Sequence, residues 1–351
     1  MDKVFKYELF NKMIRDFAVN EVKPLAHEVD EQERFPYETV EKMAKLGLMG
    51  IIVPKEYGGM GGDYKMYIKA VEELSKVCAT TGVILSAHTS LCIAPIMEYG
   101  NEEQKKKYLP KLASGEWLGA FGLTEPNAGT DANNQTTTAV KEGDHWVLNG
   151  SKIFITNAGP ANVYFVIAVK GRNPKGVECA AFIVEKGFPG FSVGKKELKM
   201  GIRGSSTCEL IFENCIVPEA NLVGKIGEGV KMALKTLDGG RVGISAQALG
   251  IAEGALEATV AYVKERKQFN KPISAFQNTQ FCLADLYTKI NAASLLVERA
   301  TEAKQNKSPM LGMYAAQAKL FAAETAMEVT TKCVQLHGGY GYMREYPVER
   351  M

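Results

Sequence analysis

Two loop-like segments combine residue types that could hold an organic ligand. FGLTEPNAGTD, residues 121–131, contains two Gly, one Pro, one Asn and two Thr, and glycine lets backbone N–H groups and hydroxyls come close to a ligand. SKIFITNAG, residues 151–159, places the ring of Phe154 and the hydroxyl of Thr156 at alternate positions of an expected strand. A tight domain-crossing loop and an ordinary half-buried strand are the structural alternatives.

A third segment, LDGGRVG at residues 237–243, puts two adjacent glycines inside a helical pattern. Each glycine costs about 1 kcal/mol relative to Ala in a helix interior, so we expect compensation, such as close approach of a ligand between Asp238 and Arg241. A helix kink is the alternative. GGMGGD and GKIGEGV both miss the G-x-G-x-x-G spacing, and no P-loop is present, so nicotinamide on a Rossmann fold is not favoured.

Composition excludes several other classes of protein. The chain has 351 residues, enough for two or three domains, and its net charge of +2 does not indicate a nucleic-acid partner. The run Lys105–Lys107 is typical of the solvated face of a helix. The start, MDKVFKYELF, has no apolar signal-peptide region, and uninterrupted apolar runs are too short for a membrane span, so we expect a cytoplasmic protein. Seven scattered cysteines without CxxC, and four histidines, predict reduced core thiols and no metal site.

Hydrophobic periodicity predicts an α+β multidomain fold in three parts. Residues 1–118 form amphipathic helical segments, one of which starts at the N-cap Asn101 with Gln104 three residues on. Residues 119–223 are rich in Val, Ile, Phe and Thr, are split by Gly, Asn and Pro, and predict an antiparallel β-domain. Residues 224–351 carry long helical patterns with short connections, which predict an antiparallel bundle.

Taken together, the motifs resemble those of the acyl-CoA dehydrogenases over nearly the whole chain, most closely the short-chain, butyryl-CoA branch. The segments that carry the resemblance are, in order, FGLTEPNAGTD, KIFITN, LDGGR, ERKQF with FQ, and QLHGGYGYMREYPVER. The resemblance implies an N-terminal helical domain, a central β-domain and a C-terminal four-helix bundle. It further implies non-covalent FAD, an acyl-CoA substrate, electron-transferring flavoprotein as electron partner, and a homotetramer built as a dimer of dimers.

The resemblance also implies a flavin site in the central domain. Thr124 is among the polar contacts, and Thr130 also faces the CoA arm. Phe154 takes the position of an aromatic residue, commonly Trp, that packs against the isoalloxazine, and Thr156 places its hydroxyl near flavin N5. The implied cofactor-binding residues of this domain are Phe121, Gly122, Leu123, Thr124, Thr130, Phe154, Ile155 and Thr156.

Two further sets of residues follow from the resemblance. The CoA-contacting turn comprises Asp238, Gly239, Gly240 and Arg241, and the acyl tail ends near residues 86–97. A second set holds the FAD of a neighbouring subunit, so the active unit is not a monomer, and Arg266 can bind the pyrophosphate with a charge-assisted bond. This set is Arg266, Phe269, Gln277, Gln335, Leu336, His337, Gly338 and Gly339.

The catalytic residue remains unknown within these 351 residues. The chemistry requires a carboxylate base at the α-carbon of the thioester and hydride transfer from the β-carbon to flavin N5. In the short-chain branch this base is a Glu in a Tyr-Glu-Gly segment, which we expect beyond Met351. Other relatives have the catalytic Glu at the position that corresponds to Gly240, and a glycine there cannot act as the base. Glu125 and Asp238 are expected to have structural and CoA-contacting roles instead.

Two functions are therefore weighed. The first is an FAD-dependent short-chain acyl-CoA dehydrogenase, and the second is a truncated or non-catalytic homologue that binds FAD or acyl-CoA. Residues 80–91, TTGVILSAHTSL, contain no Arg that could meet a second carboxylate, so a neutral short acyl chain is preferred over glutaryl-CoA. The physiological direction, dehydrogenation or enoyl-CoA reduction, stays open.

Overall fold

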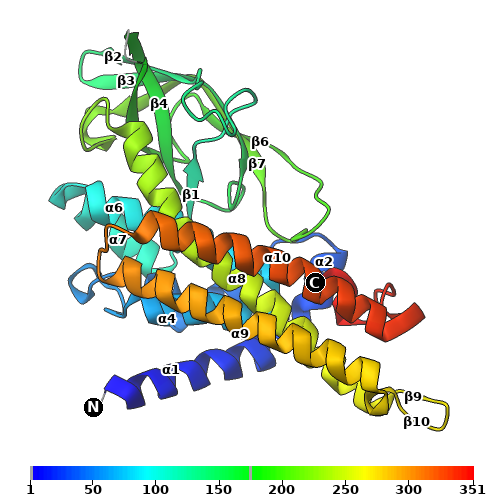
Figure 1. The fold of residues 1–351 in the computed structure, drawn as a ribbon. Helices are drawn as coiled ribbons and strands as arrows, with labels where there is room; N and C mark the ends of the chain where they lie inside the picture. The colour runs from blue at the N-terminus through cyan, green and yellow to red at the C-terminus, as the bar shows by residue number, and fades with distance from the viewer. Residues whose placement is uncertain (1–2, 174–175) are drawn as a thin grey trace. The chain divides into compact units, whose positions relative to one another are not determined.

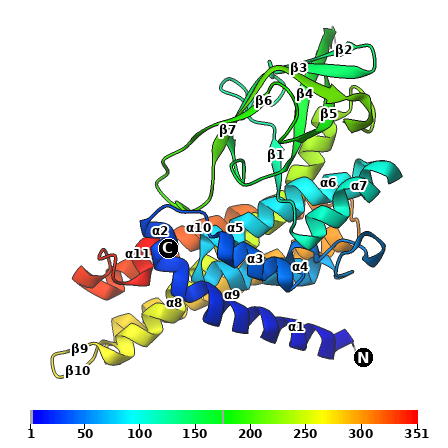
Figure 2. The same ribbon diagram turned by 180° about the vertical axis from the view of Figure 1, so that it is seen from behind.

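The computed structural model describes residues 3–173 and 176–351, which fold as two compact units (Figures 1 and 2). The first unit contains the chain up to Glu33, Asp63–Val83 and Arg241–Met351, and the second contains Arg34–Gly62 and Ile84–Gly240. This division differs from the three predicted segments, because helix α5 (Ala79–Ala87) and helix α8 (Gly229–Glu265) each continue from one unit into the other.

The first unit is helical. Helices α9 and α10 run side by side in Figure 1, and α4 packs against both α1 and α9. Two short strands, β9 (Lys267–Gln268) and β10 (Lys271–Pro272), form a hairpin before α9. The helices assigned wholly to this unit are α1 (Lys3–Phe17), α2 (Ala26–Glu31), α4 (Tyr64–Val77), α9 (Gln277–Gln305), α10 (Leu311–His337) and α11 (Pro347–Arg350).

Glycine allows α8 to lie very close to α4 within this unit. A Cβ added at Gly254 would lie 2.1 Å from the carbonyl oxygen of Lys76, and one at Gly250 would lie 2.3 Å from that of Glu72. Such distances are possible only without a side chain, so backbone contact replaces side-chain packing here. An ion pair from Lys76 to Glu253 at 2.8 Å adds a polar link between the same two helices.

The second unit contains short helices and the sheet. Its helices are α3 (Tyr37–Lys45), α6 (Ala94–Tyr99) and α7 (Glu102–Ser114), and a π-helical stretch, His88–Ile93, joins α5 to α6. The predicted start of α7 is confirmed: Asn101 Oδ1 accepts from the Gln104 backbone N–H at 2.8 Å, and Gln104 Oε1 accepts from the Asn101 N–H at 3.1 Å. This reciprocal cap satisfies two N–H groups at the helix start.

The helical run Ala79–Tyr99 is long and apolar enough to cross a membrane by length and composition. Of its most apolar window, 83% is buried inside the protein. Core helices pass the same test, so this finding is weak evidence for a membrane span. The seven cysteines are free thiols, and all except the half-buried Cys282 are buried.

The sheet has the strand order β6-β7-β3-β2-β4-β5-β8, with β1 also paired to β4. Most pairs are antiparallel, but β1 and β2 both pair with β4 in parallel, so the sheet is mixed rather than antiparallel as predicted. The reason is that β1 and β2 occupy successive parts of β4: Gly119–Gly122 pairs with Val163–Val166, and Thr138 with Val169. The strands are β1 (Gly119–Gly122), β2 (Thr138–Glu142), β3 (His145–Ile155), β4 (Val163–Asn173), β5 (Gly176–Glu185), β6 (Phe191–Lys196), β7 (Cys208–Pro218) and β8 (Leu222–Val223).

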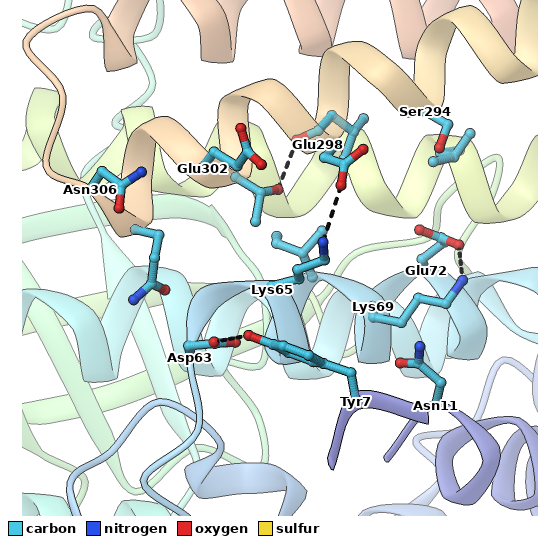
Figure 3. Close-up of a pocket in the computed structure, with 15 residues that line it drawn as sticks. Tyr7, Asn11, Asp63, Lys65, Lys69, Glu72, Ser294, Glu298, Glu302 and Asn306 are labelled. Carbon is cyan, nitrogen blue, oxygen red and sulfur yellow. Dashed lines mark hydrogen bonds and ion pairs between the residues drawn. The ribbon is translucent and has the colours of Figure 1, made fainter. Parts of the chain in front are cut away.

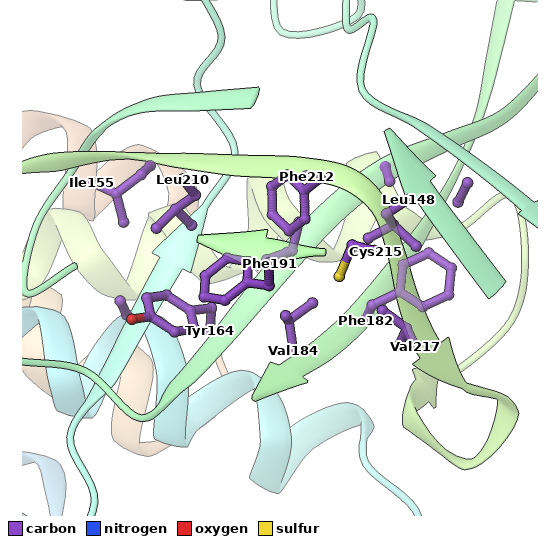
Figure 4. Packing of buried hydrophobic residues seen from close by; sticks show 14 of the residues in the cluster. Leu148, Ile155, Tyr164, Phe182, Val184, Phe191, Leu210, Phe212, Cys215 and Val217 are labelled. Atoms are coloured by element: carbon purple, nitrogen blue, oxygen red, sulfur yellow. The ribbon is translucent and has the colours of Figure 1, made fainter. Parts of the chain in front are cut away.

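Large aromatic side chains fill the core of the sheet domain (Figure 4). Trp146 packs edge-on against Phe182 with ring centroids 5.4 Å apart, and Phe191 contacts Tyr164 and Phe212 at 4.8 and 5.3 Å. Along β3 and β7, buried residues such as Trp146 and Phe212 alternate with more exposed ones over part of each strand, as expected for strands with one buried face. This packed core supports the strands between which the loop after β1 runs.

Candidate functional site

The 123–137 loop lies between two strands that are both fixed to β4. The chain leaves its pairing with β4 after Gly122 and returns at Thr137, whose carbonyl oxygen accepts from the Val169 N–H at 2.7 Å. Within the loop a turn closes between Glu125 and Ala128, and the Thr124 carbonyl accepts from the Ile153 N–H at 2.8 Å. The segment predicted to line a flavin is thus supported from β3 as well as from β4.

A buried ion pair lies beneath this loop. Lys152 Nζ contacts Glu125 Oε1 at 2.6 Å, and both side chains are almost fully buried. Glu125 also accepts from the Thr136 N–H at 2.6 Å, the Thr136 hydroxyl at 2.8 Å and the Thr137 N–H at 3.1 Å. Glu125 therefore has the structural role that the sequence predicted, because its carboxylate oxygens are engaged within the loop.

The electrostatics agree with a pair that is charged at pH 7. Burial alone would raise the pKa of Glu125, but the Lys152 ammonium and the hydrogen bonds from Thr136 and Thr137 outweigh it and lower this pKa to about 2. Burial lowers the pKa of Lys152 to about 8, against the attraction of Glu125. A carboxylate with so low a pKa is a poor general base.

Phe154 is presented to solvent by an unusual backbone. The residue has φ 59°, in the left-handed region, at an irregularity where the β3–β7 register shifts between Lys152 and Ile155. Its ring is 62% exposed, whereas the even-numbered positions Trp146 and Leu148 of the same strand are buried. Strict alternation would have buried Phe154, so the strand is not the ordinary half-buried one considered as the alternative.

The other predicted flavin residues divide into two groups. Phe121, Thr124 and Thr156 are half-buried, and Thr130 is exposed, so these side chains can reach a ligand. The side chains of Leu123 and Ile155 are buried in the protein, at 7% and 3% exposure, so at these two positions the backbone is the part available. Gly122 is buried as well, in the last position of β1.

Next to Thr156, Asn157 connects this motif to two other elements of the unit. It has φ 65° and is fully buried, and its Nδ2 donates to the carbonyl oxygens of Ile84 and Gly119 at 3.1 and 3.4 Å. Its Oδ1 has no hydrogen-bond partner among the described residues. Together with the exposed aromatic ring and the threonine hydroxyls, this orphaned acceptor fits a site that receives a polar aromatic group such as a flavin.

The segment Asp238–Arg241 lies within one continuous helix, α8. In the second unit, a Cβ at Gly240 would lie 2.8 Å from Leu91 Cδ2. The close neighbour of Gly240 in the structure is therefore the Leu91 side chain, and the close approach of a ligand to this segment stays a prediction. Gly239 is buried, Asp238 and Gly240 are half-buried, and Arg241 is exposed.

In the first unit, the structure brings together most of the residues predicted to hold a neighbouring subunit's FAD. A hollow of about 500 Å³ is lined by Tyr262, Arg266, the 335–339 segment, Tyr340 and other residues. The Arg266 guanidinium lies 5.4 Å from the centre of the Tyr340 ring. Phe269 is 89% exposed and lies outside this lining, as does Gln277, the exposed first residue of α9.

His337 forms the buried wall of this hollow. Its ring stacks on Tyr262 with centroids 4.2 Å apart, and its Nδ1 lies 2.8 Å from the Cys333 carbonyl oxygen. Burial lowers the pKa of His337, so the ring is neutral near pH 7. Gly338 has φ 60° and ends α10, which lets the chain turn sharply and expose the following Gly339.

A second hollow of the first unit, about 580 Å³, lies among α1, α4 and α9 (Figure 3). Its lining mixes polar and apolar side chains. Lys65 of α4 pairs with Glu298 of α9 at 3.1 Å, and the Tyr7 hydroxyl of α1 donates to Asp63 at the start of α4. Lys69 and Glu72 pair within α4. The first two contacts join the three helices, so a structural role accounts for them.

Lys152 and Asn157 are the residues that the sequence reasoning missed. For Lys152 a signal was available, because the period of two in β3 places it on the same face as Trp146 and Leu148, both buried. A lysine on a buried face calls for a charged partner. For Asn157 no comparable signal exists, since its left-handed backbone and its partners Ile84 and Gly119 depend on tertiary structure.

Comparison with known families assigns nearly the whole chain. Residues 6–116 match "Acyl-CoA dehydrogenase, N-terminal domain", residues 120–215 the middle domain and residues 227–351 the C-terminal domain of the same family. The chain belongs to the acyl-CoA dehydrogenase family. This confirms the predicted resemblance and the order of helical, β and helical domains.

Two individual members of the family are similar to this chain over most of its length. The "Acyl-CoA dehydrogenase, short-chain specific" of Clostridium acetobutylicum is 60% identical over 98% of this chain and 90% of its own length. The butyryl-CoA dehydrogenase structure from Megasphaera elsdenii is 49% identical, with a TM-score of 0.95 over 98% of this chain and 90% of that one.

Two further solved structures bear on cofactor and partner. A chain in the structure of the electron transferring flavoprotein of Acidaminococcus fermentans is 53% identical, with a TM-score of 0.94, covering 98% of this chain and 90% of that one. An acyl-CoA dehydrogenase from Bacillus anthracis, solved in complex with FAD, is 37% identical with a TM-score of 0.89, covering 98% and 62% of the two chains.

Proposed function

We propose that this protein is an FAD-dependent acyl-CoA dehydrogenase that acts on short-chain thioesters such as butyryl-CoA. The observation that carries the proposal is the exposed ring of Phe154, held by a left-handed backbone beside the hydroxyl-bearing 123–137 loop, in a member of this family. The short-chain and butyryl-CoA relatives support the substrate class. Similarity to enzymes of this activity does not favour the non-catalytic alternative.

Each group of residues has a part in this proposal. Phe154 stacks on the flavin, and Thr124 and Thr156 supply hydroxyls to it. Thr130 and the Asp238–Arg241 turn contact CoA, where Arg241 provides positive charge for a phosphate. Bound FAD would supply the acceptor for the hydride that leaves the β-carbon. Arg266 and the 335–339 segment hold the FAD of a neighbouring subunit.

The general base is not assigned to a residue of this sequence. Glu125 is engaged by Lys152, Thr136 and Thr137, and the position of the alternative base is Gly240, whose Cα faces Leu91.

The proposal also includes the electron partner of the protein, its oligomeric assembly and its location in the cell. Electron-transferring flavoprotein is the proposed electron partner, supported by the similarity to a chain in the Acidaminococcus fermentans structure. A homotetramer built as a dimer of dimers is proposed from the family resemblance. A cytoplasmic location is proposed from the bacterial relatives. The direction of the reaction depends on the potential of the electron donor or acceptor.

The proposal predicts the spectroscopic response of the 351-residue protein, reconstituted with FAD, to anaerobic butyryl-CoA. The flavin absorbance should shift on binding, because thioester and flavin are brought together. Prompt bleaching is not expected, because Glu125 is engaged by Lys152 and position 240 is a glycine, so neither supplies a base. Glutaryl-CoA serves as the matched control and should give a weaker shift, since residues 80–91 offer no Arg for its second carboxylate.

Prompt bleaching by butyryl-CoA would support the function and place the base within these 351 residues. Failure to bind FAD, or a larger response to glutaryl-CoA than to butyryl-CoA, would contradict the proposed cofactor or substrate, respectively.

A further inference from the structure

The fully buried ammonium group of Lys152 contacts three separate points of the 123–137 loop. Its Nζ lies 3.2 Å from the carbonyl oxygen of Leu123, 2.6 Å from Glu125 Oε1 and 2.9 Å from Gln135 Oε1. An ammonium has three N–H donors, and these three acceptors match that number. The loop is thus held at its beginning, at its turn and near its end by one side chain.

Lys152 is also next in sequence to the residues that face the predicted ligand. It lies in β3 two residues before Phe154, where the register shift begins, and the next residue, Ile153, donates its N–H to the Thr124 carbonyl. The Leu123 carbonyl that Lys152 holds belongs to the residue just before Thr124. Lys152 therefore links the two motifs.

We infer that Lys152 is a positioning residue for the flavin site: it fixes the 123–137 loop, and with it Thr124, relative to Phe154. The inference rests on the proposed function for the flavin, but its structural part concerns the loop alone. It differs from simple charge neutralisation, in which Lys152 would only balance the buried Glu125 carboxylate.

Paired variants separate these two roles. Lys152→Met leaves Glu125 buried without its cation and is expected to destabilise the protein. The double variant Lys152→Met with Glu125→Gln removes that uncompensated charge, while the amide oxygen introduced by the second change can still accept from the Thr136 N–H. Lys170→Met is the matched control, because Lys170 is an exposed strand lysine of the same sheet that pairs with Glu178 at 3.3 Å.

The first measurement is amide hydrogen exchange of the FAD-free proteins in residues 121–131. Exchange should accelerate in the double variant although its thermal midpoint recovers, because the ties to Leu123 and Gln135 are lost. Tryptophan fluorescence, which comes from Trp117 and from Trp146 in the sheet core, reports that the domain is folded. If exchange in the double variant equals that of the wild type, the inference is wrong.

The second measurement is FAD affinity, by quenching of flavin fluorescence. The double variant should bind FAD roughly 10- to 100-fold more weakly than wild type, as expected for the loss of a charge-assisted contact, while Lys170→Met binds unchanged. Recovery of full affinity in the double variant would overturn the positioning role. Failure of the wild type to bind FAD would instead contradict the proposed function, and the exchange experiment would still decide the role of Lys152.

Discussion

At the scale of single residues, His88 shows how a buried ring is held in one protonation state. The Gly119 N–H donates to its Nδ1 at 3.0 Å, so the proton lies on Nε2, which is 3.1 Å from the Leu112 carbonyl oxygen. The side chain is fully buried, and burial lowers its pKa to about 4. A protonated ring would lose the bond from Gly119.

His88 makes stability depend on pH. Its pKa is lower in the folded protein than the ordinary 6.5, so the unfolded state binds a proton first as pH falls. Its contribution is constant above about pH 6.5, and about 3 kcal/mol of stability is lost as pH falls from there to about 4. His88→Gln, which keeps a donor and an acceptor, should remove this loss.

Urea unfolding at pH 7 and pH 5 tests the prediction. The midpoint of the wild type should fall more between the two pH values than that of His88→Gln. Parallel falls in the two proteins would mean that other groups, and not His88, determine the pH dependence in this range.

At the scale of elements, α8 and α4 are the pair most sensitive to a single methyl group. Gly254→Ala raises helix propensity by about 1 kcal/mol, but its Cβ would lie 2.1 Å from the backbone oxygen of Lys76. Backbone cannot move aside cheaply, so the variant should be destabilised by about 1–3 kcal/mol despite the better propensity.

Gly240→Ala is the matched control in the same helix. Its new Cβ would meet Leu91 Cδ2, the end of a flexible side chain, at 2.8 Å, so rotation of Leu91 relieves most of the clash. The midpoint of thermal unfolding should therefore be well below that of Gly240→Ala in the variant Gly254→Ala. The reverse order would show that α4 and α8 separate readily.

Several of these elements were predictable from the sequence and others were not. The cap at Asn101 and the long helices follow from local patterns, which depend on neighbours within a few residues. The parallel pairing of β1 and β2 with β4 depends on which distant strand lies alongside. The hydrophobic pattern of β1 or of β2 does not indicate which strand that is. Phe154 is exposed although strict alternation along β3 predicts a buried side chain, because an irregularity of the strand reverses the direction of this side chain. The amino-acid sequence does not indicate where such an irregularity occurs.

At the scale of the whole molecule, the proposed flavin site draws on two chains. The residues of the 121–156 region and those around Arg266 would then belong to different subunits at each site. Two variants, each damaging one contribution, should complement each other when co-expressed: Phe154→Asp and Arg266→Glu. Random pairing into dimers would leave about a quarter of the sites intact, since half of the dimers are mixed and each has one undamaged site.

Bound FAD per chain, measured after purification by absorbance and protein determination, checks this outcome. Phe154→Asp co-expressed with Thr124→Asp is the control, because both changes damage the same contribution and should recover nothing beyond the single variants. Equal recovery in the two mixtures, or none in either, would mean that one chain supplies the whole site.

The way in which the 123–137 loop is anchored has a consequence for how such sites diversify. Because β1 and β2 are fixed to the same edge of β4, the register of these two strands does not depend on the residues at the exposed tip of the chain between them. Glu125 and Gln135 are different, because the buried Lys152 needs them as acceptors. New ligand preferences can therefore arise at exposed loop positions such as Thr130, whereas changes at the acceptors of Lys152 would reduce stability.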